Sequence, residues 1–101
     1  MDEKRLIEKM LALASPHRFR ILSTLAAEPL HVSELARRLA MSRALLYMHL
    51  QRLEAEGFIT GRLELTKDGK ALKFFDVVPF ELKLDVPTIV AAVEQSQKSE
   101  N

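Results

Sequence analysis

The chain has 101 residues, about the size of one domain, and a formal net charge of +1. Hydrophobic residues make up 48% and charged residues 29%, a balance typical of a globular chain and not of a disordered one. The longest apolar runs, such as Met10–Ala14 and Ile89–Val93, are far shorter than the ~20 residues of a transmembrane helix, so we expect no membrane span. The absence of cysteine excludes disulfides, thiolate metal sites and a cysteine nucleophile. Because Met1–Glu3 does not resemble a secretory signal, we expect a cytoplasmic protein.

Charge is distributed unevenly along the chain. Residues 1–14 are neutral in sum, residues 15–75 sum to +4 and residues 76–101 sum to −3. A middle segment that docks on phosphate and an end that avoids it would give this pattern. A chance difference of a few charges would give it equally well.

The first third of the chain predicts two helices. Apolar residues between Leu6 and Ala14 recur at spacings of three and four, which predicts a helix over about 3–14 with a wide apolar face. Ser15-Pro16 ends that helix and starts another, since serine is a good N-cap and proline is tolerated at the first helical position. Glu28-Pro29 ends the second helix. In the second helix, we expect five side chains to point inward: Phe19, Ile21, Leu22, Leu25 and Ala26.

The next segment predicts a short strand followed by two helices joined by a tight turn. Leu30–Val32 is an apolar patch that suits one strand. We expect Ser33 to cap a third helix, Glu34–Ala40, and Ser42 to cap a fourth, Arg43–Glu56, which ends at Gly57. The third helix has an inner stripe of Leu35, Ala36 and Leu39. The turn Met41-Ser42 has the length found in a helix-turn-helix.

After Gly57 the hydrophobic period changes to that of strands. Residues 58–65 alternate loosely, Asp68-Gly69 is a strong hairpin-turn signal, and Leu72–Val78 forms the returning strand. Phe80–Leu84 alternates again and predicts a further extended segment. Asp85 is expected to cap a last helix whose apolar side carries Val86, Ile89, Val90 and Val93.

This order of elements predicts a mostly α protein with a small β-hairpin wing, an α+β fold. We interpret the chain as a single winged helix-turn-helix domain, residues 1–101, with a core over 15–78. Additional helices, about 3–14 and 87–97, flank the core. They are more apolar than a core of this size requires, so a partner surface is expected on them.

The fourth helix carries the candidate functional surface. Leu46, Leu50 and Leu53 share one face and must point to the core. In a helix-turn-helix the opposite side enters the major groove of DNA, N-terminal end first. That side carries Arg43, which suits a guanine edge, and Gln51, which suits an adenine, together with Ala44, Tyr47 and Met48 for a phosphate or a thymine methyl. Alternatively, Tyr47 and Met48 pack against another protein.

Basic residues elsewhere extend this candidate surface. Lys67 and Lys70 flank the predicted hairpin tip, where they can reach a phosphate or a minor groove, or instead protect an exposed strand edge. Arg37 and Arg38 lie on the outer face of the third helix, where they either bind phosphate or are simply solvated. The full set of candidate DNA-binding residues is Arg37, Arg38, Ser42, Arg43, Ala44, Tyr47, Met48, His49, Gln51, Arg52, Arg62, Lys67 and Lys70.

Metal binding and catalysis find no support in the sequence. His17, His31 and His49 are too far apart in sequence for the usual metal-ligand spacings, and no cysteine is available. His49 lies beside the groove-facing stripe, which suits a phosphate contact. The chain has no glycine-rich phosphate loop and no hydrolase or metalloprotease motif. We therefore expect no metal, no cofactor and no enzymatic activity.

Three segments together resemble the arsenic-repressor (ArsR-type) winged-helix family. They are Ala14–Leu22, Val32–Ala36 and Ser42–Ile59, in the order and spacing of that family, and the resemblance covers about residues 5–78. Val77–Leu82 looks more like archaeal relatives.

The resemblance implies a homodimeric transcription repressor that binds a palindromic operator on double-stranded DNA. It matches the recognition helix to Arg43–Gly57 and the wing to Arg62–Phe75. It also places the dimer interface in Leu6–Ala14 and Pro87–Gln97, which gives as candidates Leu6, Ile7, Met10, Leu11, Ile89, Val90 and Val93.

The chain departs from the family pattern at two places. Metal-sensing members of the family have cysteines in the helix that matches Ser33–Ala40, or Asp, His and Glu ligands in the last helix, and neither set is present here. Small polar residues are also common where Leu45 and Tyr47 stand. We expect a DNA-binding regulator without metal sensing; the alternative is a winged-helix protein-interaction module.

Overall fold

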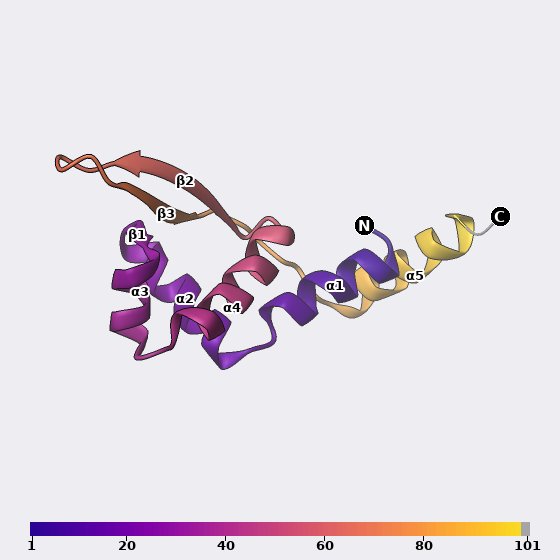
Figure 1. Ribbon diagram of the computed structural model, residues 1–101. Coiled ribbons are helices and arrows are strands. Elements are labelled where there is room, and N and C mark those ends of the chain that lie inside the picture. The colour runs from indigo at the N-terminus through magenta and orange to yellow at the C-terminus, as the bar shows by residue number, and fades with distance from the viewer. Residues whose placement is uncertain (100–101) are drawn as a thin grey trace.

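The computed structural model describes residues 1–99, and Figure 1 shows a winged helix-turn-helix with two further helices that extend to one side. The predicted fold class is confirmed. In chain order the elements are α1 Glu3–Leu13, α2 Pro16–Ala27, β1 Leu30–His31, α3 Val32–Leu39, α4 Arg43–Ala55, β2 Ile59–Leu65, β3 Ala71–Val77 and α5 Val86–Ser99.

Side-chain caps start four of the five helices in residues 1–99. Ser15 accepts a hydrogen bond from the backbone N–H of Arg18, and Pro16 follows as the first helical residue. Ser42 and Asp85 cap α4 and α5 in the same way, as predicted, and Asp2 caps α1. Each cap satisfies one of the backbone donors that a helix leaves free at its first turn.

The start of α3 differs from the prediction. The helix begins at Val32, its N-cap is His31, and no side chain accepts a hydrogen bond there. Pairing with β3 holds β1 extended up to His31, so the helix begins at the next residue and Ser33 lies inside its first turn. The Ser33 hydroxyl instead accepts a hydrogen bond from the guanidinium of Arg43. Ala40, in a left-handed conformation with φ of 51°, ends α3 and opens the turn to α4.

A single hydrophobic core joins α2, α3, α4 and the sheet. The predicted inward face of α4 is confirmed, because Leu46, Leu50 and Leu53 are at most 1% exposed. In α2 only the stripe through Ile21 and Leu25 is buried. Two of the expected inward residues of α2, Phe19 and Ala26, are exposed, since they lie off this stripe on the helix surface.

The sheet is antiparallel, with the strand order β1-β3-β2. Gly61 of β2 faces Phe75 of β3, and the hairpin turns through Thr66–Lys70, where Gly69 has a φ of 81°. The predicted hairpin is thus confirmed. The predicted extended segment Phe80–Leu84 pairs with no strand and links β3 to α5. Phe80 instead packs its ring 4.5 Å from that of Phe58.

Helices α1 and α5 pack side by side, and we call this pair the arm. The arm projects from the core on the side opposite the hairpin tip, so the molecule measures 57 × 24 × 23 Å (Figure 1). Leu6 of α1 and Ala92 of α5 are buried within the arm, and the backbone N–H of Glu3 donates to the hydroxyl of Ser96. Over residues 1–99, no helix combines the length and the hydropathy that crossing a bilayer requires.

Candidate nucleic-acid interface

Helix α4 presents a continuous exposed side opposite its buried leucines. Tyr47 is 45% exposed and Met48 is 63% exposed, and Arg43, Ala44 and Gln51 are exposed beside them. The leucine stripe fixes the rotation of the helix, because turning it would bring this polar and aromatic side into the core. No described part of the chain covers the side, so it is available to a partner.

The N-terminal end of α4 is held in place from two directions. The Ser42 hydroxyl accepts a hydrogen bond from the Leu45 N–H at 3.2 Å. The guanidinium of Arg43 donates to the Ser33 hydroxyl of α3, so this exposed arginine spans the turn between the two helices. An arginine has five N–H donors in a planar fork, and the contact with Ser33 leaves others for an incoming acceptor.

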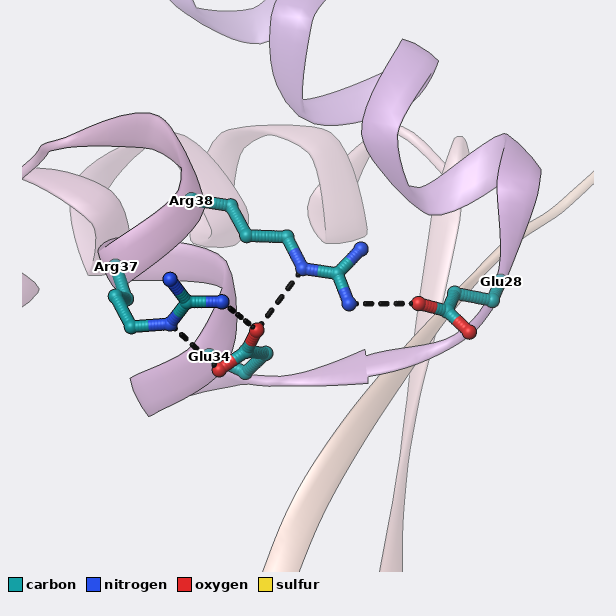
Figure 2. Close-up of polar contacts among 4 residues, drawn as sticks. All are labelled: Glu28, Glu34, Arg37 and Arg38. Atoms are coloured by element: carbon teal, nitrogen blue, oxygen red, sulfur yellow. Dashed lines mark hydrogen bonds and ion pairs between the residues drawn. The ribbon is translucent and has the colours of Figure 1, made fainter.

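The two arginines of α3 are neutralised within the chain, as Figure 2 shows. Arg37 binds both carboxylate oxygens of Glu34, at 3.0 and 2.5 Å. Arg38 donates to Glu34 at 3.0 Å and to Glu28 at 2.8 Å. Hydrogen bonds from Arg37 and Arg38 lower the pKa of Glu34 to about 2. A phosphate that binds these guanidinium groups therefore has to compete with two carboxylates.

The cations of the hairpin fall into two classes. Lys67 and Lys70 are exposed at the turn, and their ammonium groups have no partner among residues 1–99. Arg62, by contrast, donates from Nε to Asp76 at 2.8 Å, forms an ion pair with Glu64 and lies over the ring of Phe74. The geometry gives the predicted DNA contact of Arg62 no support.

His49 faces α2 and not the exposed side of α4. The guanidinium of Arg18 donates to its Nδ1 at 2.9 Å, and the ring of His17 lies 5.2 Å away between centroids. Its Nε2 is buried without a hydrogen-bond partner in the described chain. Burial, and then the positive charge of Arg18, lower the pKa of His49. The predicted phosphate contact of His49 would need this side chain to leave its position.

Arg18 is a residue whose role the sequence analysis missed. Besides its bond to His49, it donates to the carbonyl oxygens of Ala12 at 2.5 Å and Leu11 at 3.1 Å. These carbonyls end α1, so Arg18 connects the arm to α4. Nothing in the local pattern singles out this arginine of α2, because its side-chain partners come from two other helices, α1 and α4.

The last turn of α4 lies against the arm. Arg52 lines a shallow surface hollow with Glu8, Leu11, Ala55 and Glu56, and Glu56 accepts a hydrogen bond from Arg5 at 2.6 Å. Arg52 therefore lies far along α4 from Arg43, near the junction with α1. Within residues 1–99, no three His, Asp or Glu side chains are grouped so that they could hold a metal ion.

The candidate dimer residues divide into three groups. Leu6 is 6% exposed because it packs within the arm, so the structure does not leave it free for a partner. Met10 and Val93 are half-buried and line a groove between α1 and α5. The outer, more exposed residues of the arm are between 46% and 55% exposed: Ile7 and Ile89, which also line that groove, and Leu11 and Val90.

Known proteins match this chain in sequence and in fold. A family model described as a helix-turn-helix domain matches residues 13–62. An uncharacterized HTH-type transcriptional regulator from Methanocaldococcus jannaschii is 32% identical over 74 residues, which are 73% of this chain and 77% of that protein.

Solved structures support the same fold. HlyU from Vibrio cholerae has a TM-score of 0.63 and 24% identity over 98% of this chain and 97% of its own. NolR from Sinorhizobium fredii has a TM-score of 0.65 and 21% identity, over 96% and 83%. A homodimeric winged helix-turn-helix domain from Mycobacterium bovis, described as a possible ArsR-family regulator, has a TM-score of 0.66 and 20% identity, over 96% and 79%. The chain therefore belongs to the DNA-binding helix-turn-helix transcriptional regulators and has the ArsR-type winged-helix fold.

Proposed function

We propose that this protein is a cytoplasmic, homodimeric repressor that binds a palindromic operator through α4, without enzymatic activity and without the metal-sensing ligands of its family. The observation that carries the proposal is the exposed side of α4, which places Arg43, Tyr47, Met48 and Gln51 opposite a fully buried leucine stripe. The resemblance to ArsR-type proteins supports repression over activation.

Base readout rests on few side chains. Arg43, at the N-terminal end of α4, suits the two acceptors of a guanine edge, and Gln51 suits an adenine. Ala44, Tyr47 and Met48 offer apolar contact to thymine methyl groups. Because so few polar groups face the groove, phosphate contacts and DNA shape supply the rest of the specificity.

Phosphate binding is assigned first to the cations without partners, Lys67 and Lys70 at the hairpin tip. Arg37 and Arg38 join only by exchanging Glu34 and Glu28 for phosphate oxygens. Ser42 lies beside Arg43, where its backbone and hydroxyl can approach the DNA backbone. Arg62 is paired with carboxylates, His49 is bound by Arg18, and Arg52 lies at the far end of α4 from Arg43, so these three contribute least.

Dimerisation is assigned to the outer side of the arm. Ile7, Leu11, Ile89 and Val90 are all about half exposed on adjacent helices, and apolar surface of this kind associates with a second copy. The homodimeric relative from Mycobacterium bovis supports this assignment. Two copies would then place their recognition helices about 34 Å apart, one helical turn of DNA.

A binding titration at several salt concentrations tests the proposal. We expect affinity to fall steeply with salt, because lysines and arginines displace counterions from phosphates. Arg43→Ala should relax sequence preference at one base pair of each half-site, whereas Lys67→Ala with Lys70→Ala should weaken binding to all sequences alike. Affinity that does not change with salt would contradict the proposal.

A second candidate function is a protein-interaction module built on the same surface. The high exposure of Tyr47 and Met48 and the low net charge favour it. Co-purification from an extract treated with nuclease separates the two functions. A partner protein that stays bound after the DNA is digested, and that is lost in the Tyr47→Ala variant, would favour the module.

A further inference from the structure

We propose that Ser33 is a positioning residue for base readout: its hydroxyl holds the guanidinium of Arg43 so that the rest of the guanidinium is presented to a guanine. This inference rests on the proposed function and deepens it, because it makes the sequence preference depend on a residue of α3 as well as on α4. The sequence predicts Ser33 as the cap of α3, but the structure leaves its hydroxyl free of that role and places it against Arg43.

The backbone of Ser33 is fixed by the core. Its neighbours in α3, Val32 and Leu35, are 6% and 0% exposed, and the strand β1 directly before α3 is paired with β3. Two backbone hydrogen bonds, from the N–H groups of Ala40 and Met41 to carbonyls of α3, close the turn that leads to α4. The hydroxyl of Ser33 and the first turn of α4 are therefore held relative to each other by packed elements.

The partner of Arg43 is neutral, whereas the nearby arginines of α3 have a charged partner. Arg37 and Arg38 both bind the carboxylate of Glu34, as Figure 2 shows. Within residues 1–99, Arg43 forms no ion pair and donates to the hydroxyl of Ser33 instead. A hydroxyl can hold a guanidinium without cancelling its charge. Arg43 therefore keeps its full attraction for the two acceptor atoms of a guanine edge.

The contact with Ser33 leaves enough of the guanidinium for a base. An arginine has five N–H donors, of which Nε carries one and each Nη carries two. Ser33 accepts a hydrogen bond from Nη2 of Arg43, so the second hydrogen of Nη2, both hydrogens of Nη1 and the hydrogen of Nε stay available. A guanine edge accepts two hydrogen bonds, at O6 and N7. Arg43 can therefore donate both of them while Ser33 still holds it.

Holding the side chain of Arg43 before DNA binds favours base readout. A long exposed side chain loses rotamer freedom when it binds, and this loss lowers the affinity that its contact provides. Arg43 is exposed at the first position of α4, and Ser33 is the side chain of residues 1–99 that hydrogen-bonds to it. Because of Ser33, part of the loss of freedom already occurs when the protein folds. The contact with guanine then contributes more to affinity and to sequence preference.

The test compares affinity for the selected operator with affinity for an operator changed at the base pair that Arg43→Ala identifies. Ser33→Ala removes the hydroxyl, and α3 should stay folded because alanine favours a helix more than serine does. We expect the ratio of the two affinities to fall about fivefold in Ser33→Ala, with an unchanged dependence on salt because no charge is lost. Ser33→Thr keeps a hydroxyl and should retain the wild-type ratio. Ser23→Ala, exposed on α2, is the matched control and should also retain it.

A double-mutant cycle separates positioning from an independent contact of Ser33 with DNA. In the Arg43→Ala background, Ser33→Ala should not lower affinity for the operator further, because no guanidinium is left to hold. A fivefold loss in that background, or a wild-type ratio in folded Ser33→Ala, would overturn the inference while leaving DNA binding in place. Wild-type preference at every base pair in Arg43→Ala would overturn it too. Failure of the wild-type protein to bind any DNA would refute the proposed function itself, and this inference with it.

Discussion

The core of this protein buries its apolar side chains, whereas the arm leaves several of its apolar side chains about half exposed. In the core, Leu46, Leu50 and Leu53 of α4 are at most 1% exposed. In the arm, Ile7 and Val90 keep 47% and 48% of their surface in contact with water. Burial of apolar surface stabilises a fold by roughly 25 cal/mol per Å², so the core gains this energy within one chain. The arm leaves much of it to be gained from a second chain.

A substitution in the core should have the largest effect on folding. Leu50→Ala removes a fully buried side chain and leaves a cavity, so we expect a loss of about 2–5 kcal/mol in the free energy of unfolding. Met48→Ala, on the exposed side of the same helix, should change it by no more than about 0.5 kcal/mol. Urea denaturation measures both. Similar losses in the two variants would contradict the assignment of the faces of α4.

The sequence predicts the core better than it predicts the arm. Leu46, Leu50 and Leu53 recur at helical spacing and can point only inward, so periodicity alone identifies the buried face and, by elimination, the exposed one. Phe19 shows the limit of this reasoning, because it is as apolar as its neighbours but lies off the stripe that the other helices cover. Which apolar residues of the arm are covered depends on how α1 and α5 meet, and they are more than 70 residues apart in the sequence.

The polar contacts were the least predictable part of the candidate site. Arg37, Arg38 and Arg62 resemble free cations in the sequence, yet the fold pairs each with a carboxylate. Arg62 meets Asp76 only because the hairpin register places position 62 diagonally across from position 76. His49 is one residue from the exposed stripe, which is enough to turn its ring toward α2.

A charge in the arm should separate dimerisation from folding. Ile89→Glu would place a carboxylate on the outer face of α5, where burial without a partner costs several kcal/mol. We expect the dimer dissociation constant, measured by analytical ultracentrifugation, to rise about 100-fold or more, with the core still folded by circular dichroism. Ser23→Glu, on the exposed surface of α2, is the charge-matched control. An unchanged dimer dissociation constant in Ile89→Glu would show that the dimer interface lies outside the arm.

The junction between the two regions depends on Arg18. Because its guanidinium joins the carbonyls that end α1 to His49 of α4, Arg18→Ala should lower the free energy of unfolding by about 1.5–3 kcal/mol. A double-mutant cycle with His49→Ala isolates the contact between the two side chains. Strict additivity of the two single effects would show that Arg18 and His49 do not act together.

The same contact gives the smallest predicted effect, a response to acid. The pKa of His49 is lowered from 6.5, so the unfolded chain takes up this proton at a higher pH than the folded chain does. The contribution of His49 to the free energy of unfolding is therefore fully present above about pH 7, and it falls as the pH drops through 6.5 toward the lower pKa of the folded chain. Wild type should lose more stability than His49→Gln in thermal melts between pH 7 and pH 5. Parallel losses in both proteins would contradict this assignment.

Selection of bound fragments from random double-stranded DNA, using the wild-type protein, tests the central claim most directly. If the exposed side of α4 reads bases and the arm joins two copies, the selected fragments will be twofold symmetric. Their half-site centres will lie about 10–10.5 base pairs apart, and Arg43→Ala will lose preference at one position in each half. Fragments with a single asymmetric motif, or with no motif that Arg43→Ala alters, would contradict the account.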